Sequence, residues 1–222
     1  MAKKKTEAQQ EELDQLTSTE RFIDKYKKPL IIGGSAIVVI VLGIVGYQKL
    51  VAEPHEEESL DAYWNAFYEF ENDSLNLAVT GNENFDGMED VADEYDGTSG
   101  GDIAHYTMGI AAMKNGDFES ALESFESCGF EDVVLGSMVI GLQGDCYVEL
   151  DDYESAVDRY EEAASREENE FTTPMYLKKV GLAYEALGKN DDAREAYQKI
   201  KDNWENSTEG QDIEKYLARV GG

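Results

Sequence analysis

The side chains that could carry out catalysis or bind a metal are few in this chain and lie far apart. His55 and His105 are the two histidines, and neither has a cysteine or carboxylate at metal-site spacing, so both fit surface or packing roles. Gly100 and Gly101 lack a phosphate-binding pattern, and no serine or cysteine has the context of a nucleophile elbow. We therefore expect no catalytic residue, no metal and no cofactor, and predict that the protein is not an enzyme.

The two cysteines, Cys128 and Cys146, fall on helical faces that are expected to stack. A disulfide between them would need an oxidising compartment and Cα atoms within about 7 Å of each other. Two reduced thiols that pack as small apolar residues are the alternative. The sequence leaves both possibilities open.

A pattern of small and aromatic residues recurs three times in the second half of the chain. Its alanines, Ala121, Ala156 and Ala193, are 35 and 37 residues apart, close to the period of about 34 residues of a tetratricopeptide repeat. In each unit a glycine lets the second helix of a pair approach the first, and the alanine leaves room for an aromatic ring four residues later. The three sets are Gly109, Ala121 and Phe125, then Gly144, Ala156 and Tyr160, then Gly181, Ala193 and Tyr197. We predict an all-α fold in which residues 102–207 form three tetratricopeptide repeats of an α-solenoid.

The ends of such a solenoid need elements that cover the stacking faces of the terminal repeats. Residues 49–101 are expected to form leading helices, and residues 208–222 a C-terminal capping helix. The leading apolar stripe is Leu60, Tyr63, Trp64, Phe67 and Tyr68, and the capping stripe is Ile213, Tyr216, Leu217 and Val220. Residues 96–102 are glycine-rich and predict a loop, with Asp102 as the N-cap of the first repeat.

Residues 29–48 contain no charged side chain. About 20 apolar residues are enough for a helix to span a bilayer. A cleaved signal peptide has a shorter apolar core of about 7–15 residues, and the best cut, after residue 52, follows the bulky Leu50. A buried core helix is the third possibility, although this segment has no polar face. We predict a retained transmembrane helix over residues 29–48.

Basic residues crowd the N-terminal side of this segment. They are Arg21, Lys25, Lys27 and Lys28, whereas on the other side only Lys49 precedes Lys114. Cytoplasmic flanks carry the excess of Lys and Arg. The pattern therefore predicts a cytoplasmic tail over residues 1–28 and a single pass through the bacterial inner membrane, with the C-terminal domain in the periplasm.

The chain is strongly acidic, with 19 Lys and Arg against 48 Asp and Glu and a net charge of −29. This balance argues against binding to nucleic acid. With 41% hydrophobic and 10% aromatic residues, the chain is also too apolar for a disordered acidic protein. Solvated helix faces explain the charge most simply, while a salty environment and a basic partner are the alternatives.

The inner face of a repeat array, lined by the first helix of each pair, is the expected site of partner binding. The apolar residues assigned to this groove are Ile103, Tyr106, Ile110, Met113, Met138, Val148, Met175 and Leu182, with Asp145, Glu149, Lys178 and Glu185 among them. Methionine-rich surfaces adapt to varied apolar segments. We expect these residues to be partly exposed and replaceable without loss of the fold, unless the leading helices or the anchor cover the groove.

The layout resembles the YfgM-like ancillary subunit family of the SecYEG translocon. The similarity extends from Arg21 to the C-terminus and is most detailed in segments 85–95, 116–118 and 212–216. Members of that family are membrane-anchored tetratricopeptide proteins. The resemblance implies protein partners: the SecYEG translocon, a membrane-anchored periplasmic foldase or chaperone, and newly exported clients.

Together these features predict an inner-membrane-anchored periplasmic tetratricopeptide adaptor that binds protein partners and helps newly exported proteins at the translocon. The alternative is a structural scaffold of another cell-envelope complex, for division or secretion. An anchored enzyme ranks third, because no catalytic site is evident.

Overall fold

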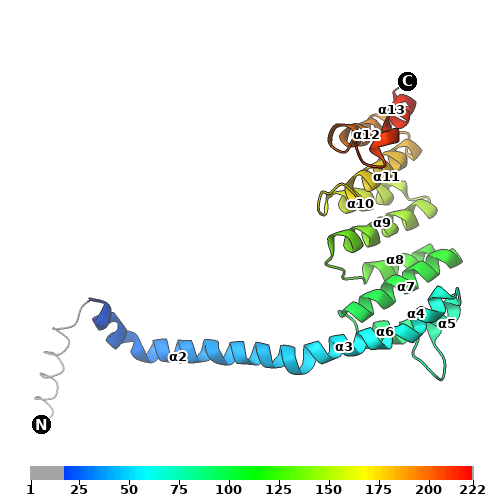
Figure 1. Ribbon diagram of the computed structural model, residues 1–222. Helices are drawn as coiled ribbons and strands as arrows, with labels where there is room; N and C mark the ends of the chain where they lie inside the picture. The colour runs from blue at the N-terminus through cyan, green and yellow to red at the C-terminus, as the bar shows by residue number, and fades with distance from the viewer. Residues whose placement is uncertain (1–17, 222) are drawn as a thin grey trace, which may run out of the picture. The chain divides into compact units, whose positions relative to one another are not determined.

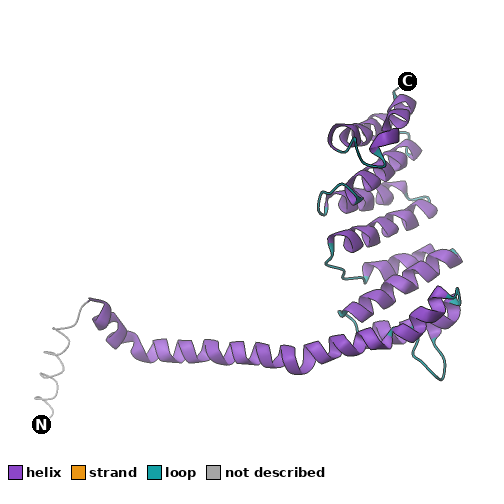
Figure 2. Ribbon diagram, in the orientation of Figure 1, coloured by secondary structure: helices purple, strands orange, loops and turns teal. Residues whose placement is uncertain are grey.

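The computed structural model describes residues 18–221 of the chain (Figure 1). Within that range the regular elements are helices, and the only β-type pairing is an isolated bridge between Asn82 and Phe85 (Figure 2). The predicted all-α class is therefore confirmed for the described residues. The chain divides into two compact units, Met1–Pro54 and His55–Gly222, which are described in turn.

The first unit contains helix α2, Ser18–Tyr47, followed by the π-helical turn η1, Gln48–Ala52. Helix α2 continues through Pro29, so the end of the predicted cytoplasmic tail and the predicted membrane segment form one element. Among the described residues one helical stretch, Lys25–Glu71, is long and apolar enough to cross a membrane, and an 18-residue window of it has a mean hydropathy of 2.5. The large apolar side chains of α2 are exposed.

The second unit begins with four short helices: α3, Glu53–Ala62; α4, Trp64–Glu71; α5, Leu75–Thr80; and α6, Met88–Glu94. The prediction of a single buried apolar stripe is wrong for part of α3 and α4. Tyr63 and Phe67 pack with Met88 of α6, but Trp64 and Tyr68 are exposed. Leu60 is exposed as well, and the reason is that no core cluster of the described residues covers these three side chains. Helix α5 was not predicted.

The first repeat begins earlier than predicted. Helix α7 spans Ser99–Asn115, and its N-cap is Thr98, whose hydroxyl accepts a hydrogen bond from the Gly101 amide. The assignment of Asp102 as N-cap is wrong, since Asp102 lies in the first turn and accepts a 2.7 Å hydrogen bond from the Gly129 amide. The glycines are helical because the packing requires them: a Cβ on Gly100 would lie 2.3 Å from the Ser59 carbonyl oxygen.

Three helical hairpins follow and stack in chain order (Figure 1). They are α7 with α8, Phe118–Glu126; α9, Val133–Glu149, with α10, Tyr153–Ser165; and α11, Thr172–Ala186, with α12, Asn190–Asn203. Gly116, Asp151 and Gly188 lie in the turns between the two helices of each hairpin, with φ of 78°, 59° and 71°. This left-handed backbone favours glycine and tolerates aspartate.

The predicted contact between glycine and aromatic ring is present in all three hairpins. The pairs are Gly109 with Phe125, Gly144 with Tyr160, and Gly181 with Tyr197. A Cβ added to any of these glycines would lie between 2.2 and 2.5 Å from a ring carbon. The three alanines of the pattern are fully buried beside these rings. The repeat register is therefore confirmed, and its physical basis is close helix approach over a glycine.

The last element is helix α13, Ile213–Val220, preceded by the 3-10 turn η2, Gly210–Asp212. Ile213 and Val220 are buried against Tyr197 and Ile200 of α12. The amphipathic C-terminal segment thus covers the stacking face of the third hairpin.

Candidate protein-binding surfaces

The residues assigned to the inner groove lie on α7, α9 and α11, the first helix of each hairpin. All eight are half-buried or exposed. Leu182 is 41% exposed, whereas its neighbours Gly181 and Ala183 are buried. Leu135, 47% exposed and three residues before Met138, shares a face of α9 with it and belongs to the same surface. Leu135 was not predicted, because it precedes the repeat pattern in the chain.

The eight residues differ in what they contact. Tyr106, Ile110 and Met113 pack in the core cluster around Phe125, and Val148 and Met175 pack in the cluster around Tyr160. In the part of the chain that the structure describes, Ile103, Met138 and Leu182 belong to no core cluster. Removing Tyr106 would therefore cost packing energy, so the expectation that every groove residue is replaceable without loss of stability needs correction.

Two acidic residues of the inner face are engaged in bonds between helices. The Tyr160 hydroxyl donates a 2.5 Å hydrogen bond to Asp145 Oδ1, and Lys179 Nζ lies 2.6 Å from the same oxygen. In the next hairpin the Tyr197 hydroxyl donates to Glu185, which also pairs with Arg219 of α13 at 2.5 Å. A tyrosine, a carboxylate and a cation from the following element thus tie the hairpins together.

The pKa values of these groups follow from their surroundings. Burial raises the pKa of the Tyr160 hydroxyl, and the hydrogen bond to Asp145 raises it further. Burial also raises the pKa of Glu185, but hydrogen bonds from Arg219 and Tyr197 outweigh this effect and leave it below its ordinary value of 4.5. Glu185 is therefore held as a carboxylate. The first hairpin has Phe125 at this position and cannot form the equivalent bond.

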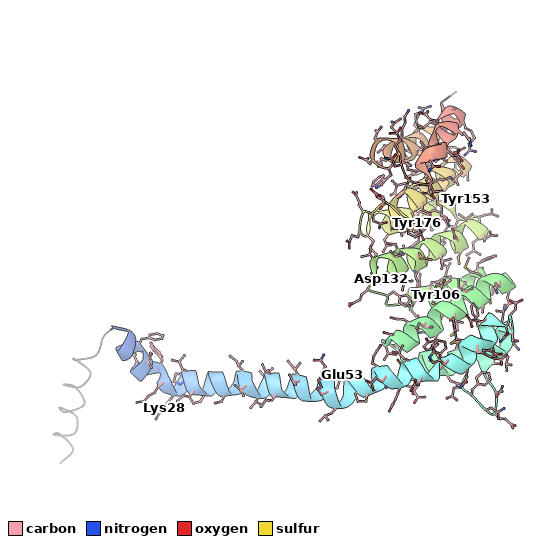
Figure 3. The ribbon with its side chains drawn as sticks, viewed as in Figure 1. Lys28, Glu53, Tyr106, Asp132, Tyr153 and Tyr176 are labelled. Carbon is pink, nitrogen blue, oxygen red and sulfur yellow. The ribbon has the colours of Figure 1, made fainter. Side chains whose placement is uncertain are left out.

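Tyr176 is a further aromatic residue of the inner region that the sequence analysis did not single out. Its ring stacks on Tyr160 at 6.3 Å and covers Gly141 of α9, where a Cβ would lie 2.0 Å away. Its pKa is raised by burial, then by Asp145, and also by the nearby phenol of Tyr106. Figure 3 shows Tyr106 on α7 and Tyr176 on α11. Tyr176 thus packs on both α9 and α10 of the preceding hairpin.

A further candidate surface lies on the other side of α11. It is a cleft of about 760 Å³ between α10, α11 and α12. Its lining includes Leu177 and Val180 of α11, which lie across the helix from Met175 and Leu182. The sequence analysis did not predict this cleft. A sequence signal for it is the small residues Ala164 and Ala196, which leave space between the second helices of neighbouring hairpins.

The remaining chemical groups are isolated. Cys128 and Cys146 are free thiols in the structure, and burial raises their pKa values to about 12 and about 11. His55 stacks near Tyr95 at 5.0 Å, and His105 Nε2 lies 3.8 Å from Asp96 Oδ1. Within residues 18–221 no group of three or more metal-ligating side chains is placed to hold an ion.

Residues 142–208 match the tetratricopeptide repeat family. This region is a tetratricopeptide fold. The match spans the second and third hairpins, and the first hairpin repeats their glycine–aromatic contact. No curated protein matches the chain.

Two solved structures are similar to the chain. The first, titled "Crystal structure of MamA", is 20% identical with a TM-score of 0.40, and the match covers 54% of this chain and 75% of that one. The second, titled "Crystal structure of MamA protein", is 15% identical with a TM-score of 0.49, and the match covers 75% of this chain and 90% of that one.

Proposed function

We propose that this chain is a single-pass inner-membrane protein whose periplasmic tetratricopeptide domain is an adaptor that helps newly exported proteins at the translocon. An apolar helix near the N-terminus with basic residues ahead of it supports the anchor and its orientation. Tetratricopeptide folds bind protein partners through extended concave surfaces. The resemblance to the YfgM-like family supports the SecYEG translocon and a membrane-anchored periplasmic foldase as partners.

The observation that carries this proposal is the set of inner-face side chains that no core cluster uses. Met138 and Leu182 lie on successive hairpins, and Leu135 extends the same apolar surface along α9. An unfolded client or a partner tail exposes apolar side chains that such a surface would shield from water. Methionine side chains at these positions adapt to segments of different shape.

Mild-detergent purification of the full chain, followed by identification of the co-purifying proteins, tests this function. The wild-type chain should retain SecYEG and foldase subunits. The double variant Met138→Asp and Leu182→Asp should lose them at an unchanged melting temperature. A matched control, Asn206→Asp with Thr208→Asp, adds the same charge on exposed positions and should retain both partners. Recovery of division or secretion components in their place would contradict the translocon role.

The proposed orientation has its own test. Protease added outside intact spheroplasts should digest residues 60–222 and spare a tag at the N-terminus, because the basic flank keeps the tail inside. Protection of the C-terminal domain would overturn both the periplasmic location and the translocon role.

A further inference from the structure

The cleft between α10 and α12 combines an apolar floor with acidic rims. Its floor is formed by Ala164, Leu177, Val180 and Ala196, with Trp204 at one end. Glu161 and Glu168 line it from the α10 side, and Asp192 and Glu195 line it from α12. We propose that this cleft binds a basic amphipathic helix of a partner protein. This site is separate from the inner face on which the proposed function rests.

The negative charge of the cleft is largely uncompensated. Lys199 is the one cation among the lining residues, and it is paired with Glu195 at 3.1 Å on the exposed rim. Glu161 accepts a 3.1 Å hydrogen bond from the Tyr184 hydroxyl. Burial, Glu161 and Asp192 together raise the pKa of Tyr184 to about 12. Nearby carboxylates have this effect because they disfavour the negatively charged phenolate. A cation entering the cleft would therefore meet a favourable potential.

The form of the cleft favours a helix as the occupant. One rim is formed by Glu161 of α10 and Glu168 of the loop that follows it, and the other by Asp192 and Glu195 of α12, while Leu177 and Val180 of α11 lie between them. Two acidic rims on either side of an apolar floor match a helix that is apolar on one face and basic on its flanks. An amphipathic helix would place its apolar residues on Leu177 and Trp204, the partly exposed apolar side chains of the cleft, and its lysines or arginines against both rims. Anionic lipids and nucleic acids carry the wrong charge for these rims.

The test uses the full chain in nanodiscs of zwitterionic lipid and a synthetic 18-residue peptide of leucine and lysine at amphipathic helical spacing. The chain has two tryptophans, and Trp64 is exposed on α4. In a Trp64→Phe background, Trp204 fluorescence therefore reports binding at the cleft itself. We expect saturable binding of the lysine peptide. A glutamate peptide of the same pattern should not bind, and a scrambled lysine peptide without an apolar face should bind about tenfold more weakly or less.

Charge reversal on the rims provides the decisive comparison. Glu168→Lys with Asp192→Lys should raise the dissociation constant about tenfold or more. Glu123→Lys with Glu126→Lys makes the same change in net charge on exposed positions of α8 and should leave it within about twofold. Equal losses in both double variants, or equal binding of the scrambled peptide, would reduce the effect to general attraction by an acidic domain and overturn the proposal.

The proposal for the inner face and the proposal for the cleft can be tested separately. Met138→Asp with Leu182→Asp, which should abolish partner capture at the inner face, should still bind the lysine peptide at the cleft. Loss of peptide binding in this variant, with the melting temperature unchanged, would place the peptide on the inner face and contradict the cleft assignment.

Discussion

The ring of Tyr197 lies on Gly181, and its hydroxyl reaches Glu185 one helical turn further along α11 at 2.5 Å. Glu185 also binds Arg219, so this one tyrosine both fills the contact between α11 and α12 and connects it to α13. Tyr160 does the same in the preceding hairpin through Asp145 and Lys179. The aromatic position of the repeat, wherever it is a tyrosine, is therefore also part of a polar link from its hairpin to the next element, which is α11 for Tyr160 and α13 for Tyr197.

Tyr197→Phe keeps the ring and removes the hydroxyl donor to Glu185. A hydrogen bond to a charged group contributes about 1.5–3 kcal/mol, so we expect a loss of stability of about that size in urea unfolding followed by circular dichroism. Tyr153→Phe removes only a 3.5 Å exposed contact with Asp151 and should change stability by less than about 0.5 kcal/mol. Equal effects of the two substitutions would show that the link is not structural.

Gly144→Ala distinguishes helix propensity from packing. Alanine stabilises a helix interior by about 1 kcal/mol relative to glycine, but here its Cβ would lie 2.5 Å from Tyr160 Cε1. Overpacking costs about 1–3 kcal/mol, so the net effect should be a lower melting temperature. Glu154→Ala on the exposed face of α10 is the control and should change little. A stabilised Gly144→Ala variant would contradict the ring-on-glycine contact.

Glu185→Gln should remove a pH-dependent part of the stability. Because the folded-state pKa of Glu185 lies below its ordinary value of 4.5, the carboxylate contributes stability at neutral pH, and this is lost as the pH falls through the folded value. The wild-type chain should exceed the variant in urea midpoint at pH 7, and the difference should disappear at acidic pH below 4.5. A difference that persisted at pH 2 would arise from packing and not from charge.

The thiols should react slowly while the domain is folded. Burial and Asp102 raise the pKa of Cys128 to about 12, and burial followed by Asp145 raises that of Cys146 to about 11. Compared with the ordinary value of 9.0, at least about a hundredfold less thiolate is present at pH 8. Thiol titration without reductant should therefore detect two groups per chain in urea and a much slower reaction in buffer. No reactive thiol in urea would reveal a disulfide.

Tyr106→Asp and Leu182→Asp should separate folding from binding. Tyr106 contacts the rings of Phe125 and Phe130 at 6.2 and 6.3 Å, so its replacement should lower the melting temperature. Leu182 is exposed and belongs to no core cluster among the described residues, so its replacement should leave the melting temperature unchanged. Equal destabilisation would place Leu182 in the core.

The glycine, alanine and aromatic positions of the three hairpins could be predicted because steric fit at a helix crossing depends on residue size at fixed spacing. The start of the first repeat could not. Gly100 and Gly101 predict a loop in sequence, but they lie in α7, where the backbones of Ser59 and Tyr95 pack so closely on them that a Cβ would not fit. The prediction that the whole leading apolar stripe is buried was wrong in part for a similar reason. Helical periodicity shows which residues share a face of a helix, but not which of them a neighbouring helix covers.

The candidate binding surfaces were likewise predictable from the sequence only in part. Placement of Met138 and Leu182 on the first helix of each hairpin follows from the repeat register. Their separation from the core clusters, and the engagement of Asp145 and Glu185 by Tyr160 and Tyr197, depend on side-chain contacts between residues up to 34 positions apart. Such contacts leave no local pattern in the sequence.

The sequence by itself determined the apolar N-terminal segment, the acidic character and the register of the three hairpins, because each depends on local composition or on a fixed period. Only the tertiary structure decided which faces stay uncovered and where the acidic residues gather. The cleft between α10 and α12 exists because Ala164 and Ala196, 32 residues apart in the chain, are brought to face each other over α11. The cleft forms where two hairpins stack, so no single segment of the sequence predicts it.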